Sequence, residues 1–141
     1  MFWRRPRTST PSPPPSWSTV WRGERVLVEH ADPDIREQLL STLRARGYDP
    51  IGCGGPAERD HCPVLSQEPC PAVQQADAVV TGLVDERAGR MIARTMLDLA
   101  PGRPLLVVTS PEVAATLDPD LQRRAVDAQG RTIGAALDEA S

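Results

Sequence analysis

The sequence predicts an α/β protein in which helices cover both faces of a doubly wound parallel sheet. Three observations support this fold class. Short runs of Val, Leu and Ile alternate along the chain with stretches of helical periodicity. The strand candidates are apolar throughout, which is typical of strands that are buried on both faces. Helical stretches also separate successive strands, and such connections build a parallel sheet with right-handed crossovers.

The first unit of this pattern is a strand, a helix and a second strand. Residues 25–29 (RVLVE) form an apolar run that suits a buried strand. Asp32 and Pro33 then predict a helix start, because an Asp side chain caps free backbone N–H groups and Pro fits the first helical position. Apolar residues recur at helical spacing up to Gly47, which fits a C-terminal cap. Residues 48–53 are a weaker strand, whose proline favours an edge position.

Two further strands and the helix between them follow. Residues 76–83 (ADAVVTGL) and 104–109 (PLLVVT) are apolar enough to be buried strands. Between them, residues 85–99 predict a helix whose inward face contains Met91, Ile92, Thr95, Met96 and Leu99.

The C-terminal part of the chain is less regular. Ser-Pro at 110–111 and Asp-Pro at 118–119 repeat the cap-and-proline start and predict two short helices. After residue 128 the pattern thins. We therefore expect a truncated C-terminal end, with at most a short fifth strand at 131–133 and a remnant helix at 135–140.

The composition excludes several classes of function. The chain has 141 residues and a net charge of −3, with 19 Asp plus Glu against 16 basic residues, all of which are Arg. The absence of Lys excludes a Walker-type phosphate loop and Schiff-base lysine chemistry. No apolar run approaches the roughly 18 residues that a membrane-spanning helix needs. The acidic balance argues against a surface that binds nucleic-acid phosphates.

Residues 1–22 differ from the rest of the chain. They carry four Arg, all three Trp and no acid, and residues 6–19 are a Pro/Ser/Thr-rich run without apolar periodicity. Such a run buries too little surface to offset the entropy of ordering it, so we expect a disordered basic leader and one α/β domain over 23–141. Arg4 and Arg5 are not followed by the apolar segment of an export signal. We therefore expect a cytoplasmic protein with reduced cysteines.

Three stretches resemble a CheY-like response-regulator receiver domain. Residues 25–53 (RVLVEHADPDIREQLLSTLRARGYDPIGC) resemble its first strand–helix–strand unit, and ADAVVTGL and RPLLVVTS resemble its third and fourth strands. The resemblance extends from residue 24 to about residue 110. It implies a flavodoxin-like three-layer α/β/α fold with sheet order 2-1-3-4-5, and a functional pocket at the carboxyl ends of strands 1, 3 and 4.

The resemblance also implies which residues occupy the phosphorylation pocket of a receiver. The positions of its metal-binding acidic pair carry His30 and Ala31, and the position of its phosphoacceptor Asp carries Gly82. The switch threonine is retained as Thr109, whereas the family's Lys has no counterpart. Phosphoryl transfer needs a carboxylate nucleophile and a Mg²⁺ held by oxygen ligands, so we expect no Mg²⁺-dependent phosphorylation, no phosphoacceptor and no catalytic residue. Glu29 is a further departure, which indicates either an exposed strand end or an error in the predicted register.

A segment rich in Cys and Pro stands where a receiver has its second helix, and its prolines predict a loop. Cys53, Cys62 and Cys70 are spaced C-x8-C-x7-C, and with His61 or His30 they could ligate Zn²⁺ or an iron–sulfur cluster. No C-x2-C pair is present, however, and such pairs are what make zinc spacing recognisable. A redox disulfide and three thiols without any site remain open as alternatives.

Two functional hypotheses follow from the sequence. The first is a receiver-like regulatory module of bacterial signal transduction that is not phosphorylated, is not an enzyme and binds a protein partner rather than nucleic acid or a membrane. The second is a metal-, iron–sulfur- or redox-sensing protein that uses the three cysteines. The sequence does not identify the partner or the oligomeric state.

Overall fold

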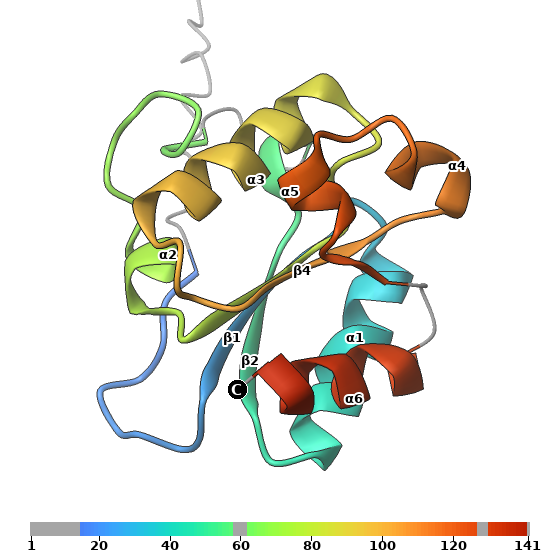
Figure 1. Ribbon diagram of the computed structural model, residues 1–141. Helices are drawn as coiled ribbons and strands as arrows, with labels where there is room; N and C mark the ends of the chain where they lie inside the picture. The colour runs from blue at the N-terminus through green and yellow to red at the C-terminus, as the bar shows by residue number, and fades with distance from the viewer. Residues whose placement is uncertain (1–14, 58–61, 127–129, 141) are drawn as a thin grey trace, which may run out of the picture.

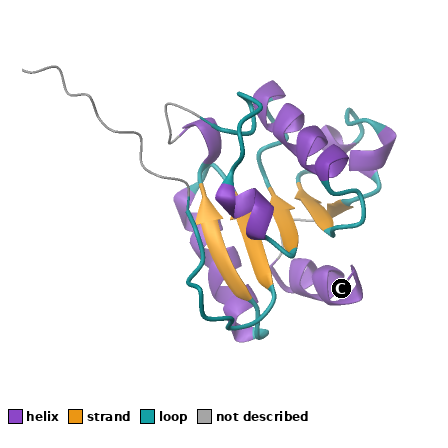
Figure 2. Ribbon diagram, turned by 90° about the vertical axis from the view of Figure 1, so that its left-hand side faces the viewer, coloured by secondary structure: helices purple, strands orange, loops and turns teal. Residues whose placement is uncertain are grey.

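The computed structural model describes residues 15–57, 62–126 and 130–140. It shows a five-stranded parallel sheet in the order β2-β1-β3-β4-β5, with helices on both faces (Figures 1 and 2). This arrangement confirms the predicted fold class and sheet order. The strands are β1 (Arg25–Glu29), β2 (Asp49–Cys53), β3 (Ala78–Thr81), β4 (Leu105–Val108) and β5 (Ala125–Val126). The helices are α1 (Pro33–Ala45), α2 (Pro71–Gln75), α3 (Arg87–Leu99), α4 (Pro111–Ala114), α5 (Pro119–Gln122) and α6 (Gly130–Ala140). None of the described helices is long and apolar enough to cross a membrane.

One face of the sheet is covered by α1 and α6, which pack against each other below the sheet in Figure 1. Leu43 of α1 and Ile133 and Leu137 of α6 are fully buried there, against valines of β1 and β3. Asp32 caps α1 as predicted, because its side chain accepts hydrogen bonds from the backbone N–H groups of Asp34 and Ile35.

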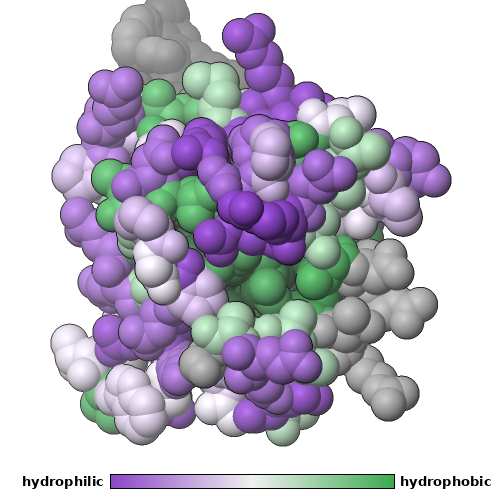
Figure 3. Space-filling view, viewed as in Figure 1, coloured by the Kyte–Doolittle hydropathy of each residue, from purple (hydrophilic) through white to green (hydrophobic). Residues whose placement is uncertain are grey.

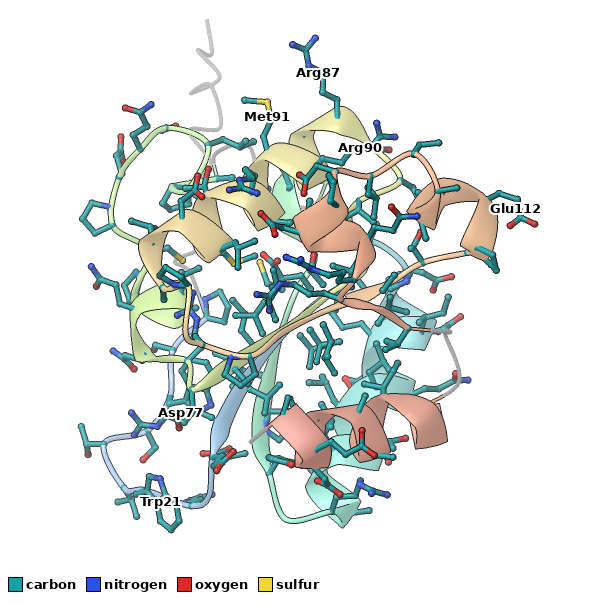
Figure 4. The ribbon with its side chains drawn as sticks, viewed as in Figure 1. Trp21, Asp77, Arg87, Arg90, Met91 and Glu112 are labelled. Carbon is teal, nitrogen blue, oxygen red and sulfur yellow. The ribbon has the colours of Figure 1, made fainter. Side chains whose placement is uncertain are left out.

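The other face of the sheet is covered by α2, α3 and the short helices α4 and α5 (Figure 1). The prediction that Met91 and Leu99 face inward is wrong, since their side chains are 52% and 69% exposed. Figure 4 shows Met91 and Arg87 projecting outward from α3. Ile92 and Met96 are buried as predicted, and the buried stripe of α3 also includes Gly89 and Ala93, small residues that do not stand out in a hydrophobic pattern.

The prediction of a truncated C-terminal end is also wrong. The fifth strand is a two-residue segment at Ala125–Val126, before the predicted position at 131–133, and α6 is an 11-residue helix. Ile133 and Leu137 are four residues apart and therefore lie on the same side of α6, where they complete the core against α1.

The segment between β2 and β3 is mostly loop, as predicted, with a 3₁₀ turn at Gly55–Ala57. It also contains the five-residue helix α2, which begins at Pro71. The prolines of this segment predict a loop. Pro71 is nevertheless compatible with a helix, because at the first helical position the missing N–H of Pro has no helical partner to lose. Residues 58–61 of this segment lie outside the described part of the chain.

Trp17 belongs to the predicted leader, and the structure describes it packed against the domain. Trp17 is only 8% exposed and belongs to the hydrophobic cluster on the α2–α3 face. Its indole N–H donates to the carbonyl oxygen of Asp49, at 2.9 Å, and the Arg25 guanidinium lies 6.0 Å from the ring centre. The folded body therefore includes Trp17, while residues 1–14 lie outside the described part of the chain.

Candidate functional site

The pocket that the resemblance implied lies at the carboxyl ends of β1 and β3. A small cavity of about 200 Å³ opens there, and His30, Ala31 and Gly82 line it together with Asp85. Thr109 follows β4 at the same edge of the sheet and contacts this group through Asp85. The carboxyl ends of parallel strands meet at one edge, so strand register alone brings these residues together.

The His30 side chain fills the space that a side chain at position 82 would need. A Cβ atom built on Gly82 would lie 2.3 Å from His30 Cδ2 and 3.0 Å from His30 Nε2. The first distance is far below a van der Waals contact, so an aspartate at position 82 would require the imidazole to move. In this conformation of His30, position 82 therefore has room only for a glycine.

The His30 imidazole is held in place by the start of α1. Its Nδ1 accepts a hydrogen bond from the backbone N–H of Asp32, at 3.0 Å, so the proton of the neutral ring is on Nε2. The Arg36 guanidinium donates to the His30 carbonyl oxygen, at 2.7 Å. Burial lowers the pKa of His30, against the opposing charges of Asp32 and Asp85, and favours the neutral ring.

Thr109 and Asp85 form a polar contact across the pocket. The Thr109 hydroxyl donates to Asp85 Oδ1, at 3.0 Å, and joins the loop after β4 to the loop after β3. The N-terminal cap position of α3 is Glu86, so Asp85 precedes the helix and accepts from Thr109. The sequence held no local signal for this pair, because 24 residues separate its members.

Glu29 is a buried carboxyl group. Neither an exposed strand end nor an error in the predicted register explains it. Its side chain is only 4% exposed, and the register of β1 is as predicted, with Cys53 and Thr81 as its strand neighbours. Burial raises the pKa of Glu29 to about 7, although a hydrogen bond with Thr81 and the charge of Arg103 act in the opposite direction. Its Oε1 atom is buried and has no hydrogen-bond partner within the described residues.

The three cysteines lie on the α2–α3 face of the sheet as free thiols. Cys70 is buried directly before α2, whereas Cys53 and Cys62 are half-buried against the same hydrophobic cluster. Among the residues that the structure describes, no three His, Cys, Asp or Glu side chains are close enough to share a metal ion. His61 lies outside those residues, and the predicted metal set of the three cysteines with His61 or His30 stays a prediction.

Comparison with known proteins supports the receiver fold. No family model matches the chain, and no curated protein matches it. Among solved structures, a response-regulator receiver domain protein from Clostridium thermocellum aligns with a TM-score of 0.61 and 14% identity over 83% of this chain and 93% of that one. A response-regulator receiver protein from Sinorhizobium medicae aligns with a TM-score of 0.61 and 15% identity, over 84% of this chain and 94% of that one. A putative pilus assembly-related protein from Burkholderia pseudomallei aligns with a TM-score of 0.60 and 17% identity, over 88% of this chain and 94% of that one.

The alignments cover 93–94% of these neighbours, so the likeness extends over nearly their whole length. At such low identity the likeness concerns the fold alone. Function must therefore be argued from the side chains in the pocket.

Proposed function

We propose that this receiver-like domain is a regulatory module that binds a protein partner, catalyses no reaction and is not switched by phosphorylation of its pocket. The fold and the acidic net charge support a protein partner over nucleic acid. The fold alone does not decide phosphorylation, which depends on four positions at the carboxyl edge of the sheet.

The observation that carries the proposal is the contact between His30 and Gly82. Phosphorylation of a receiver needs a carboxylate where Gly82 stands and Mg²⁺ ligands where His30 and Ala31 stand. None of these residues supplies a carboxylate oxygen. The imidazole also occupies the space where a nucleophilic side chain would extend, with 2.3 Å from its Cδ2 to a Cβ at position 82.

The nearby carboxylates support the same proposal. Asp32 is engaged in capping α1, and Asp85 accepts the hydrogen bond of Thr109. A switch threonine that is already bonded to a carboxylate holds the loop after β4 in one position without a phosphoryl group. We therefore expect the partner surface to be formed constitutively.

The first experiment tests phosphorylation directly. The protein is incubated with acetyl phosphate and Mg²⁺ and its intact mass is measured, with an ordinary receiver domain as the positive control. We expect no change in mass. An acid-labile gain of about 80 Da, roughly one phosphoryl group, would contradict the proposal. A His30→Ala variant shows whether any such adduct is on the histidine.

The second experiment tests partner binding. The tagged protein is recovered from its native cells, the co-purifying protein is identified by mass spectrometry, and its affinity is measured with purified components. We expect the same affinity with and without acetyl phosphate and Mg²⁺. A Thr109→Val variant is expected to weaken binding, because it releases the loop that Asp85 holds. An affinity that acetyl phosphate changes about tenfold (roughly 1.4 kcal/mol) would refute constitutive binding.

A further inference from the structure

A second and larger hollow lies on the α2–α3 face, away from the pocket just described. Its volume is about 660 Å³, and it is bordered by the loop before α2, by α2 and by the C-terminal end of α3. Hydrophobic surface is visible in Figure 3 in this region, left of centre.

The walls of this hollow are largely apolar. Val64 comes from the loop, Val73 from α2 and Leu99 from the last turn of α3. Leu99 is 69% exposed, so its apolar side chain is accessible at the edge of the hollow. The volume is within the range of small-molecule sites, which are mostly apolar with a few polar groups that fix orientation.

One side chain in the wall is a cation without an ionic partner. Arg103 Nη1 donates to the carbonyl oxygens of Val73 and Ala76 at the end of α2. Among the described residues, its buried Nη2 has no hydrogen-bond partner and Arg103 forms no ion pair. The guanidinium is therefore anchored at one nitrogen, and the partly ionised Glu29 offsets its charge only in part.

The two carboxyl groups near Arg103 do not change this conclusion. Glu29 attracts it, but the pKa of Glu29 is raised to about 7, so that carboxyl is only partly ionised near neutral pH. Glu68 also borders the hollow, and it already interacts with another residue of the chain. Burial lowers the pKa of Arg103, which means that water solvates its charge poorly.

We infer that this hollow binds a small amphipathic acid, with its anionic head toward the Arg103 guanidinium and its apolar body between Val64, Val73 and Leu99. An anion supplies the charge that Arg103 lacks, and charge-assisted hydrogen bonds to a guanidinium are among the strong ones. The apolar body covers the exposed Leu99 side chain at the end of α3.

The test uses octanoate as the probe and follows the backbone amides of the isotope-labelled protein by NMR. We expect saturable shifts at α2 and at the C-terminal end of α3. Octanol, which lacks the charge, and acetate, which lacks the apolar body, should bind much more weakly. Equal binding of octanol, or shifts spread over the whole surface, would overturn the inference.

Two variants and a control assign the site. Arg103→Gln should weaken octanoate binding at least about tenfold, the cost of one charge-assisted contact. Leu99→Glu places a negative charge beside the hollow on an already exposed position, so it should weaken binding while the fold is kept. Arg44→Gln removes an exposed charge on α1, across the sheet, and should have no effect. Equal weakening by Arg44→Gln, or unchanged binding in Leu99→Glu, would refute the site.

Discussion

The two faces of the sheet differ in what their cores contain. Among the described residues, the buried side chains of the α1–α6 face are apolar, and two regular helices cover this face. The α2–α3 face buries the Glu29 carboxyl and part of Arg103, and it leaves a hollow beside a five-residue helix. Both faces share the same strands, so one well-packed face is enough to fix the register while the other tolerates polar groups and empty space. Polar groups of this kind cost stability and are therefore where function is best sought.

The largest expected effect is on the well-packed face. Leu43 of α1 is fully buried among apolar side chains of the sheet and α6, so Leu43→Ala should lower the free energy of unfolding by about 4 kcal/mol. Leu97→Ala makes the same change on the α2–α3 face and should cost less, because that face has room to relax. Urea denaturation of both variants measures the difference. Equal losses would mean that the two faces are packed equally well.

The next effect concerns the buried carboxyl group of Glu29 on the α2–α3 face. The pKa of Glu29 is about 7 in the folded protein and near the ordinary value of 4.5 when the chain unfolds. As pH rises from about 4.5 to 7, the unfolded state loses this proton first, so stability falls with pH, by about 3 kcal/mol in all. Glu29→Gln, which cannot ionise, should therefore be more stable than the native protein at pH 8 and similar to it at pH 5.

Urea denaturation at several pH values between 5 and 8 measures this effect. Glu37→Gln on the exposed surface of α1 is the matched control and should leave the native pH profile unchanged. The same pH slope in Glu29→Gln as in the native protein would show that other groups cause it.

A smaller effect tests whether Trp17 is part of the folded domain. Trp17→Phe keeps an aromatic ring in the hydrophobic cluster but removes the N–H that donates to the Asp49 carbonyl oxygen. Losing one such hydrogen bond should cost about 1 kcal/mol in the free energy of unfolding. Trp21→Phe is the matched control, since Trp21 is mostly exposed, and it should have no measurable effect. An equal response of the two variants would place the domain boundary after residue 17.

The features that could be predicted from the sequence are those that local pattern and strand register determine. The Asp32 cap depends on neighbouring residues, and the sheet order follows from the alternation of strands and helices. The meeting of His30, Gly82 and Thr109 likewise follows from the shared edge of parallel strands. These features need no knowledge of side-chain conformation.

The features that were missed depend on packing between distant residues. Trp17 lies in a Pro/Ser-rich run, and only its contact with Asp49 places it in the core. The buried stripes of α3 and α6 contain small residues that a hydrophobic pattern underweights. The position of the His30 ring against Gly82 is set by side-chain conformation, which no spacing rule encodes.

The smallest expected effect concerns the outer edge of the well-packed face. Asp138 of α6 accepts hydrogen bonds from the Tyr48 hydroxyl and the Arg46 guanidinium, which joins α6 to the end of α1. These two donors hold the pKa of Asp138 below its ordinary value of 3.8, so the stabilisation is present above that pH and is lost as pH falls through the lowered pKa. The contact is at the surface, where ion pairs contribute little, so Asp138→Asn should reduce stability only slightly at neutral pH. Amide hydrogen exchange should show faster exchange confined to α6, whereas Glu139→Gln on the same helix should show none. Faster exchange throughout the sheet would mean that α6 is essential to the entire fold and not only to its own face.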